Sequence, residues 1–344
     1  MPTAPVDEAG TVLYYEDSGP PSGGGAYTTL IIIHGAYFNL RAFYPLLPYA
    51  ECNNLRIVLL NQRDYRNSTP LSDSDLALLH SQDKKAQESF VLGRVLELAA
   101  FLKWFVEEEA IPQLSENGSG GLSIVMWSSG NFVGVAFLGV ADMIPPSSRE
   151  VLNRYIHPPD LISGCPALVE EECWTIANDT SLSPAQKLEV FPRWNSSYFT
   201  HAAETTSTYT IDDLKDIPSR EEFVRGLNST ADNEPTPTLT RIPFEVLEEM
   251  TDSEIFSSSQ MHILSIHPDI YLECMQTGLF DTEFAKRTFP RVKVEIRKMG
   301  LERRESKIWI PGTRQVSIRV AKGWNHHAHC DFPLDVARLF SDIA

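Results

Sequence analysis

The chain has 344 residues, of which 42% are hydrophobic and 22% charged. This is the composition of an ordinary globular protein and excludes a disordered or fibrous chain. Its length exceeds the usual size of one compact core, so we expect a core domain with a sizeable insertion. Asp and Glu number 46 against 29 Lys and Arg, a formal net charge of −17. That excess argues against binding to nucleic acid or to anionic membranes.

The first part of the chain alternates apolar runs with helical patterns. Strands are predicted at Thr11–Tyr15, Thr28–Ile33 and Leu55–Leu60, and the last two are continuous apolar runs, as in strands buried on both faces of a parallel sheet. A short helical segment is expected at Ala42–Ala50, and Lys84–Glu109 has the spacing of an amphipathic helix. Strands that alternate with helices indicate crossover connections and a parallel sheet.

The middle of the chain begins with another strand and then changes character. An apolar run at Leu122–Met126 predicts a buried strand, and a further strand is expected near Asp160–Ser163. Residues Val151–Ser259 are rich in Pro, Ser, Thr and acidic residues, with helical patches at Asp212–Asp216 and Phe244–Met250. We interpret most of this segment as a helical lid, which in enzymes covers the site and forms much of the substrate pocket.

Two further strands are predicted in the last part, at Met261–Ile266 and Val316–Val320. Between them, Gly300–Arg314 is charged and punctuated by glycine and proline, which indicates an inserted hairpin or loop. The prediction is therefore an α/β fold: a mostly parallel, doubly wound sheet with a mainly helical lid inserted after the sixth strand. Residues 1–165 and 259–344 would form the core, and residues 166–258 the cap.

Targeting signals and disulfides are not evident. Residues 1–8 contain neither a basic region nor an apolar segment, so no signal peptide is visible. The five cysteines form an odd, scattered set without metal-ligand spacing, typical of reduced thiols, and we expect a cytoplasmic protein. The cysteines are Cys52, Cys165, Cys173, Cys274 and Cys330.

A candidate nucleophile lies where the strand at Leu122–Met126 ends. Ser128 is followed two residues later by Gly130, and an apolar helical pattern comes next. A serine on a sharp strand-to-helix turn projects its hydroxyl from the sheet, close to a helix N-terminus. The elbow pattern is Gly-x-Ser-x-Gly, and Met126 replaces its first glycine. Ser129 fits the pattern less well than Ser128.

Further motifs, taken in order, resemble those of the α/β-hydrolase superfamily over nearly the whole chain. His34-Gly35-Ala36 resembles the family's oxyanion segment, and Asn61–Ser68 resembles its Asp-x-Arg-Gly-x-Gly-x-Ser loop with both glycines replaced. Gly323–His326 resembles the Gly-x-x-His segment that carries the catalytic histidine. Asn61–Tyr65 and Asn325-His326 are also similar to a group of fungal members of unassigned chemistry.

The resemblance implies a role for each of these residues. Ser128 would be the nucleophile and His326 the base that takes its proton, with His327 as the alternative base. Asp269 would be the acid that orients the imidazole, with Asp281 as its alternative.

Two backbone N–H groups, those of Ala36 and Ser129, would bind the oxyanion. Tyr37 and Trp127 are the predicted substrate-binding side chains, although packing under the lid (Tyr37) or in the core (Trp127) explains them equally. Epoxide hydrolases and haloalkane dehalogenases are disfavoured, because those members carry aspartate where Ser128 stands.

The leading hypothesis is a serine hydrolase that cleaves a small to medium, largely apolar carboxylic ester or lactone. The same triad would serve C–C bond hydrolysis, acyl transfer or a cyclisation in secondary metabolism. A hydrolase-fold binding protein without turnover is the alternative from another class. The expected partner is a small-molecule substrate, with no metal, nucleotide or flavin cofactor. A homodimer and a monomer are both compatible with the sequence.

Overall fold

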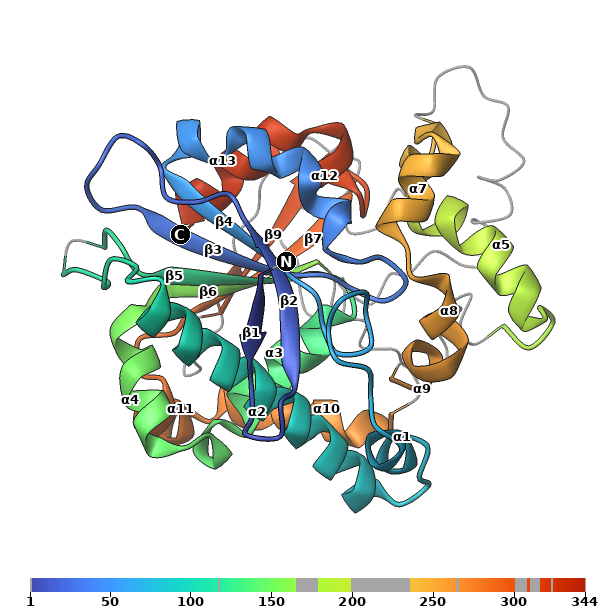
Figure 1. Cartoon of the computed structure of the whole chain (residues 1–344), viewed down its shortest axis with the longest axis horizontal. Helices are drawn as coiled ribbons and strands as arrows, with labels where there is room; N and C mark the ends of the chain where they lie inside the picture. The colour runs from blue at the N-terminus through green and yellow to red at the C-terminus, as the bar shows by residue number, and fades with distance from the viewer. Residues whose placement is uncertain are drawn as a thin grey trace.

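The computed structural model describes residues 2–116, 118–164, 179–198, 236–263, 266–300, 308–309, 316–322 and 324–343. In this part of the chain, nine strands form one sheet in the order β1-β2-β4-β3-β5-β6-β7-β9-β8 (Figure 1). The strands are β1 (Thr3–Pro5), β2 (Val12–Asp17), β3 (Thr28–Ile33), β4 (Leu55–Leu60), β5 (Leu122–Met126), β6 (Ile156–Gly164), β7 (Val294–Gly300), β8 (Ile308–Trp309) and β9 (Val316–Lys322).

The centre of the sheet is parallel and its two margins are antiparallel. β4, β3, β5, β6, β7 and β9 pair in parallel with their neighbours. β1 with β2, β2 with β4, and β8 with β9 are antiparallel pairs. The mostly parallel sheet predicted from the sequence is confirmed.

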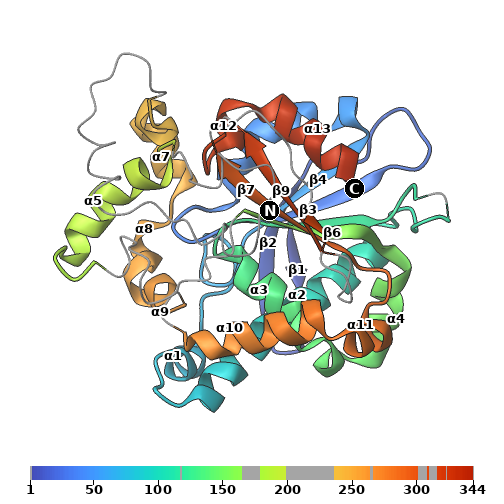
Figure 2. The same cartoon turned by 180° about the vertical axis from the view of Figure 1, so that it is seen from behind.

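Helices cover both faces of this sheet. α12 and α13 lie on one face together with η1, and α2, α3, α4, α10 and α11 lie on the other (Figures 1 and 2). The α-helices of the core are α1 (Asp73–Leu79), α2 (Lys84–Glu108), α3 (Gly130–Gly139), α4 (Pro146–Tyr155), α10 (Pro268–Met275), α11 (Thr282–Thr288), α12 (Ala328–Asp331) and α13 (Pro333–Ile343). Shorter 3₁₀ and π segments are η1 (Leu40–Tyr49), η2 (Glu51–Asn53), η3 (Ala141–Met143) and η8 (Gln276–Phe280).

Alternation along the strands divides the hydrophobic core into two layers. In β3, Leu30 and Ile32 pack in the layer that holds η1 and α13, whereas Ile31 and Ile33 pack in the layer that holds α2 and α3. β4 alternates in the same way. Because a strand points successive side chains to opposite faces, a continuous apolar run fills both layers. This is why the continuous runs at these strands predict a sheet covered on both sides.

The lid region is helical where the structure describes it. Between β6 and β7, before α10, lie α5 (Pro184–Asn195), η6 (Thr238–Arg241), α7 (Phe244–Met250), α8 (Ser253–Ile255), η7 (Phe256–Gln260) and α9 (Met261–Ile263). α5, α7 and α8 lie beyond one edge of the layered core (Figure 1). The predicted helix at Phe244–Met250 is confirmed, and the patch at Asp212–Asp216 lies outside the described residues.

One predicted strand is wrong and another was missed. Met261–Ile266 was expected to be a strand, but Met261–Ile263 form α9. The strand next to β9 is instead β7, Val294–Gly300, which pairs in parallel with β6 and β9. A six-residue apolar run fits a buried strand and a buried helical turn equally, so periodicity alone could not decide. No described helix combines the length and the low charge needed to cross a bilayer.

Candidate active site

Three parallel strands end at the same level and place their following loops side by side. Ile33, the last residue of β3, pairs with Leu60 of β4 and with Met126 of β5. Ligands of open α/β sheets bind beyond these carboxyl ends. The loops that begin at His34, Asn61 and Trp127 therefore meet at one edge of the sheet.

Ser128 occupies a strained backbone conformation on the turn between β5 and α3. Its φ of 54° lies in the left-handed region, which non-glycine residues rarely adopt and which costs about 1–3 kcal/mol. The turn is fixed by hydrogen bonds from Trp127 N–H to the Ile33 carbonyl, 2.9 Å, and from Gly130 N–H to the Trp127 carbonyl, 2.9 Å. Such strain is characteristic of a nucleophile elbow.

Two glycines allow the loop after β3 to approach this turn. A Cβ atom on Gly35 would lie 2.5 Å from Ser128 Cβ and 3.1 Å from Ser128 Oγ. A Cβ atom on Gly130 would lie 2.7 Å from the His34 carbonyl oxygen. Glycine is therefore required at both positions by close packing of the backbone. Met126, where the pattern has its other glycine, is fully buried in the core.

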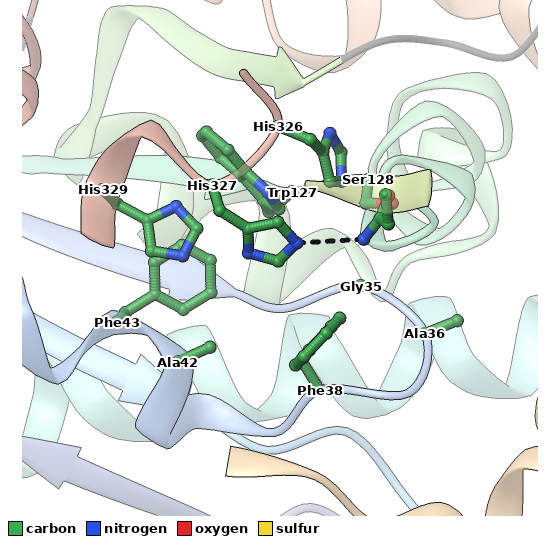
Figure 3. Close-up of a pocket in the computed structure, with 11 residues that line it drawn as sticks. Gly35, Ala36, Phe38, Ala42, Phe43, Trp127, Ser128, His326, His327 and His329 are labelled. Atoms are coloured by element: carbon green, nitrogen blue, oxygen red, sulfur yellow. Dashed lines mark hydrogen bonds between the residues drawn. The ribbon is translucent and has the colours of Figure 1, made fainter. Parts of the chain in front are cut away.

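Ser128 and His326 line the same pocket. In Figure 3, His326 projects toward the end of the pocket that holds Ser128, and His329 lies at the other end beside Phe43. The loop after β9 and the turn after β5 thus bring a serine and a histidine together across the sheet edge. The lining residues are Gly35, Ala36, Phe38, Ala42, Phe43, Trp127, Ser128, Asn195, His326, His327 and His329.

Burial keeps His326 neutral, the protonation state that a general base needs. It lowers the pKa of His326 from its ordinary value of 6.5 to about 4. Among the described contacts, no hydrogen bond joins His326 to Ser128 or to a carboxylate. Hydrogen bonds between catalytic groups are often long until substrate binds, so the shared pocket is the more informative observation.

His327, the alternative base, is held by the lid. Its Nε2 lies 3.0 Å from Asn195 Nδ2, at the end of α5, and the dashed line in Figure 3 marks this contact. Its side chain is 2% exposed. Asn195 also lines the pocket. No local pattern predicts this, because Asn195 is far along the chain from every other lining residue.

The predicted acids do not lie in this pocket. Asp269 is in the first turn of α10, 56% exposed, with its carboxylate 3.6 Å from His267 Nδ1. Asp281 accepts a hydrogen bond from the Phe284 N–H, 2.8 Å, and caps α11. Asp269 was placed beyond the end of a strand at Met261–Ile266, and that segment begins as a helix instead. The structure thus removes the positional argument for Asp269.

The two predicted oxyanion donors flank Ser128. No described hydrogen bond uses the backbone N–H of Ala36 or of Ser129. Ala36 follows Gly35, which packs against Ser128, and Ser129 immediately precedes α3. Both N–H groups are therefore available to an oxygen atom at the turn.

The two predicted substrate-binding side chains differ in position. Trp127 is 3% exposed and lines the pocket, with its ring packed edge-on against Phe43 at a centroid separation of 5.8 Å. Tyr37 is not among the residues lining either pocket; its ring lies 5.1 Å from that of Phe38 and 5.4 Å from that of Phe191 in α5. Tyr37 thus packs beneath the lid.

A second, larger pocket lies beside Ser129. Its walls are mainly apolar, and its polar groups include Arg63 and Arg94, each of which pairs with both Glu97, at 2.6 and 2.7 Å, and Asp75, at 3.3 and 3.1 Å. The two arginines therefore bring little net charge to the cavity. The pocket is lined by Gln62, Arg63, Leu71, Phe90, Val91, Arg94, Ser129, Phe132, Val133, Gln260, Ile263 and Tyr271.

Asp331 joins the lid to the loop that carries His326. Its carboxylate accepts hydrogen bonds from Tyr198 Oη, 2.6 Å, and Thr238 Oγ1, 2.5 Å, and pairs with Arg241, 2.7 Å. All three partners belong to the predicted cap. A buried charge with several partners is costly to unpair, so these contacts hold that part of the lid against the site.

Burial of His34 should make the folded protein less stable in mild acid. It is fully buried, its Nδ1–H donates to the Gly35 carbonyl at 2.8 Å, and its Nε2 accepts from the Gln62 N–H at 3.2 Å. Burial lowers its pKa from 6.5 to about 4. A depressed folded-state pKa means that the stabilisation is complete above pH 6.5 and is lost as pH falls toward 4.

We therefore expect the stability difference between wild type and His34→Gln to shrink by about 2 kcal/mol between pH 7.5 and pH 5. Urea unfolding of both proteins at the two pH values measures it. A difference that stays constant would contradict the assignment of a neutral, buried His34.

Comparison with known proteins supports the fold. No protein-family model matches the chain, and no curated protein matches it. Solved structures do match over nearly its whole length. A laboratory-evolved variant of potato epoxide hydrolase is 12% identical, with 99% of this chain and 98% of that chain covered and a TM-score of 0.50.

Two bacterial structures match in the same way. An esterase from Exiguobacterium antarcticum is 10% identical, with 99% and 98% covered and a TM-score of 0.45. A bromoperoxidase from Bacillus anthracis is 11% identical, with 98% and 97% covered and a TM-score of 0.43. None of these three is fungal, so the narrower fungal resemblance gains no support from them. The chain has the α/β-hydrolase fold.

Proposed function

We propose that the protein is a serine hydrolase that cleaves small to medium, largely apolar carboxylic esters or lactones. The observation that carries the proposal is Ser128, held at a φ of 54° in one pocket with His326. Strain of this kind persists only where the surrounding structure imposes it, and it clusters at active sites. A serine that only capped a helix would have no need of this conformation.

In the proposed reaction, Ser128 Oγ attacks the ester carbonyl carbon while His326 accepts its proton. The carbonyl oxygen becomes an oxyanion, which the N–H groups of Ala36 and Ser129 stabilise. Collapse expels the alcohol, which takes the proton from His326, and leaves an acyl group on Ser128. Water, deprotonated by His326, then attacks the acyl carbon and releases the carboxylic acid and free Ser128.

The two pockets suit an apolar substrate. The larger one adjoins Ser129 and presents Phe90, Phe132, Val133 and Tyr271 to a bound group. Apolar walls with a few polar groups are typical of small-molecule sites. We assign this cavity to the acyl or alcohol chain, with residues 166–258 as a cap over it. The same serine and histidine would also serve C–C bond hydrolysis, acyl transfer or a cyclisation.

A small molecule is the partner that this proposal requires, and we place the protein in the cytoplasm, with no role in binding nucleic acid or membranes. Three described cysteines, Cys52, Cys274 and Cys330, are free thiols, as expected in a reducing compartment. A homodimer is compatible with this function, since Ser128 and His326 come from one chain.

The test is the release of p-nitrophenol from acetate and butyrate esters, together with pH-stat titration of a simple lactone. The proposal expects turnover, with the ester preferred over a p-nitrophenyl phosphate control. A protein that hydrolyses none of these substrates and also resists a fluorophosphonate probe would instead be a non-catalytic binding protein with a hydrolase fold.

The position of Asp269 predicts that Asp269→Asn retains wild-type kcat within about threefold, since an exposed surface substitution away from the site has little effect. Steady-state kinetics on the butyrate ester measures this. A drop of about 10³-fold or more would restore Asp269 as the acid of the triad. Residues 301–307, which directly follow β7, lie outside the described residues and contain Glu302 and Glu305. These two carboxylates are the next to substitute.

A further inference from the structure

Two histidines that line the Ser128 pocket, His327 and His329, form a cluster with Cys330 that the proposed hydrolysis does not use. His327, His329 and Cys330 each place one potential ligand atom within 4.8 Å of those of the other two. They lie within the four-residue segment 327–330, which begins at the cap residue of α12 and runs into that helix. Figure 3 shows His329 at the end of the pocket away from Ser128, with His327 between His329 and Ser128.

The histidines of this cluster are buried without enough hydrogen bonds. His329 is 1% exposed, and within the described part of the chain neither of its ring nitrogens has a partner. His327 Nδ1 is also without a partner there. A buried imidazole carries one N–H donor and one lone pair, and each such group is normally satisfied. Three unpaired nitrogens in one small space indicate that something else binds there.

The contact at His327 fits a metal ligand, and the Cys330 thiol donates a weak hydrogen bond to the Ala42 carbonyl, 3.8 Å, which metal binding would replace. Histidines that bind a metal through one nitrogen usually donate from the other to a neighbouring side chain. His327 Nε2 already lies 3.0 Å from the Asn195 amide, which leaves Nδ1 for a ligand role. The amide nitrogen and oxygen of Asn195 exchange places by a simple flip, so the oxygen can accept from Nε2–H.

Two imidazoles and one thiolate select a borderline-soft divalent ion, and zinc is the common case. Around zinc, three such ligand atoms would be about 3.5 Å apart, so those of this cluster, now within 4.8 Å of one another, must draw together by about 1.3 Å at most. The neighbouring Asp331 is not a competing ligand, because its carboxylate is occupied by Tyr198, Thr238 and Arg241. Cys330 would bind as the thiolate and release its proton to solvent.

We propose that His327, His329 and Cys330 bind one zinc ion in a three-ligand site that fixes the segment following His326. A water molecule would complete the four-coordinate site. This ion is separate from the acyl-transfer chemistry at Ser128, so its presence does not depend on the proposed function.

The experiment uses tag-free, full-length protein that has been treated with chelator and dialysed. Titration with Co²⁺ should give a thiolate-to-metal absorption band that saturates at one equivalent and disappears when Zn²⁺ is added. Cys330→Ser should abolish the band, and His329→Gln should weaken zinc binding by at least about tenfold. Zinc should also raise the melting temperature of wild type and protect Cys330 from alkylation.

Matched controls separate this site from other thiols and from catalysis. Cys274→Ser removes another buried thiol, and Cys52→Ser an exposed one, so both should bind Co²⁺ as wild type does. Ser128→Ala should also bind it normally, whatever its activity. If wild type binds less than about a tenth of an equivalent of Co²⁺, or if Cys330→Ser retains the absorption band, the proposal is wrong. A buried water molecule would then be the hydrogen-bond partner of the histidines. Protection of Cys330 from alkylation is measured on wild type alone, so this result does not depend on whether a variant folds.

Discussion

Ser128→Ala is expected to lower kcat for p-nitrophenyl butyrate by at least about 10³-fold, the scale on which hydrolases lose activity without their nucleophile. The substitution removes only Oγ, and alanine meets the same backbone strain at φ 54° as serine does. The fold should therefore persist, which an unchanged melting temperature would confirm. The remaining rate would reflect binding and the oxyanion donors alone.

Ser129→Ala is the matched control for this prediction. Its side chain makes no capping hydrogen bond at the start of α3, and its proposed contribution is the backbone N–H, which alanine retains. We expect its kcat to stay within about threefold of wild type. If Ser129→Ala lost activity and Ser128→Ala retained it, the nucleophile would be Ser129, and the assignment of Ser128 would be wrong.

Gly35→Ala is expected to have the second-largest effect, although Gly35 carries no functional group. Its added Cβ would lie 2.5 Å from Ser128 Cβ, so either the loop after β3 or the turn after β5 must move. Overpacking of this kind costs about 3 kcal/mol. A displacement of the reacting groups by about 1 Å costs about 10²-fold in rate. Urea unfolding and steady-state kinetics measure the two effects.

Gly93→Ala provides the control for adding a methyl group to a glycine. Gly93 lies inside α2, and a Cβ there would meet no atom within 4 Å. Alanine favours the helix over glycine by about 1 kcal/mol, so this variant should be slightly more stable and equally active. If Gly35→Ala behaved in the same way as Gly93→Ala, the close approach at Ser128 would not constrain the site.

The sequence identified the centre of the sheet well because its strands are apolar on both faces. The predicted bounds of β3 and β4, Thr28–Ile33 and Leu55–Leu60, match the structure residue for residue. Ser128 could be located because a strand, a small-residue turn and an apolar helix follow one another without a gap. Local sequence patterns were sufficient for β3, β4 and the Ser128 turn, because the residues of each element alone indicate its structure.

The strands in the C-terminal part of the sheet could not be predicted by the same reasoning. β7 contains Glu295, Arg297 and Lys298, and such a charged run does not suggest a central strand, whereas the apolar run at Met261–Ile266 does. The error moved the expected acid to Asp269 on the surface. Asn195 was missed for a different reason: only the folded chain brings α5 to His327, and no local pattern reports a contact over that separation.

Covalent labelling of wild type with a fluorophosphonate, followed by mass spectrometry of the intact protein and its peptides, identifies the activated serine. We expect one label per chain, on the peptide that contains Ser128, and no label on Ser128→Ala. Labelling at another residue, or an unlabelled protein that still hydrolyses esters, would contradict the assignment of Ser128 as the activated nucleophile.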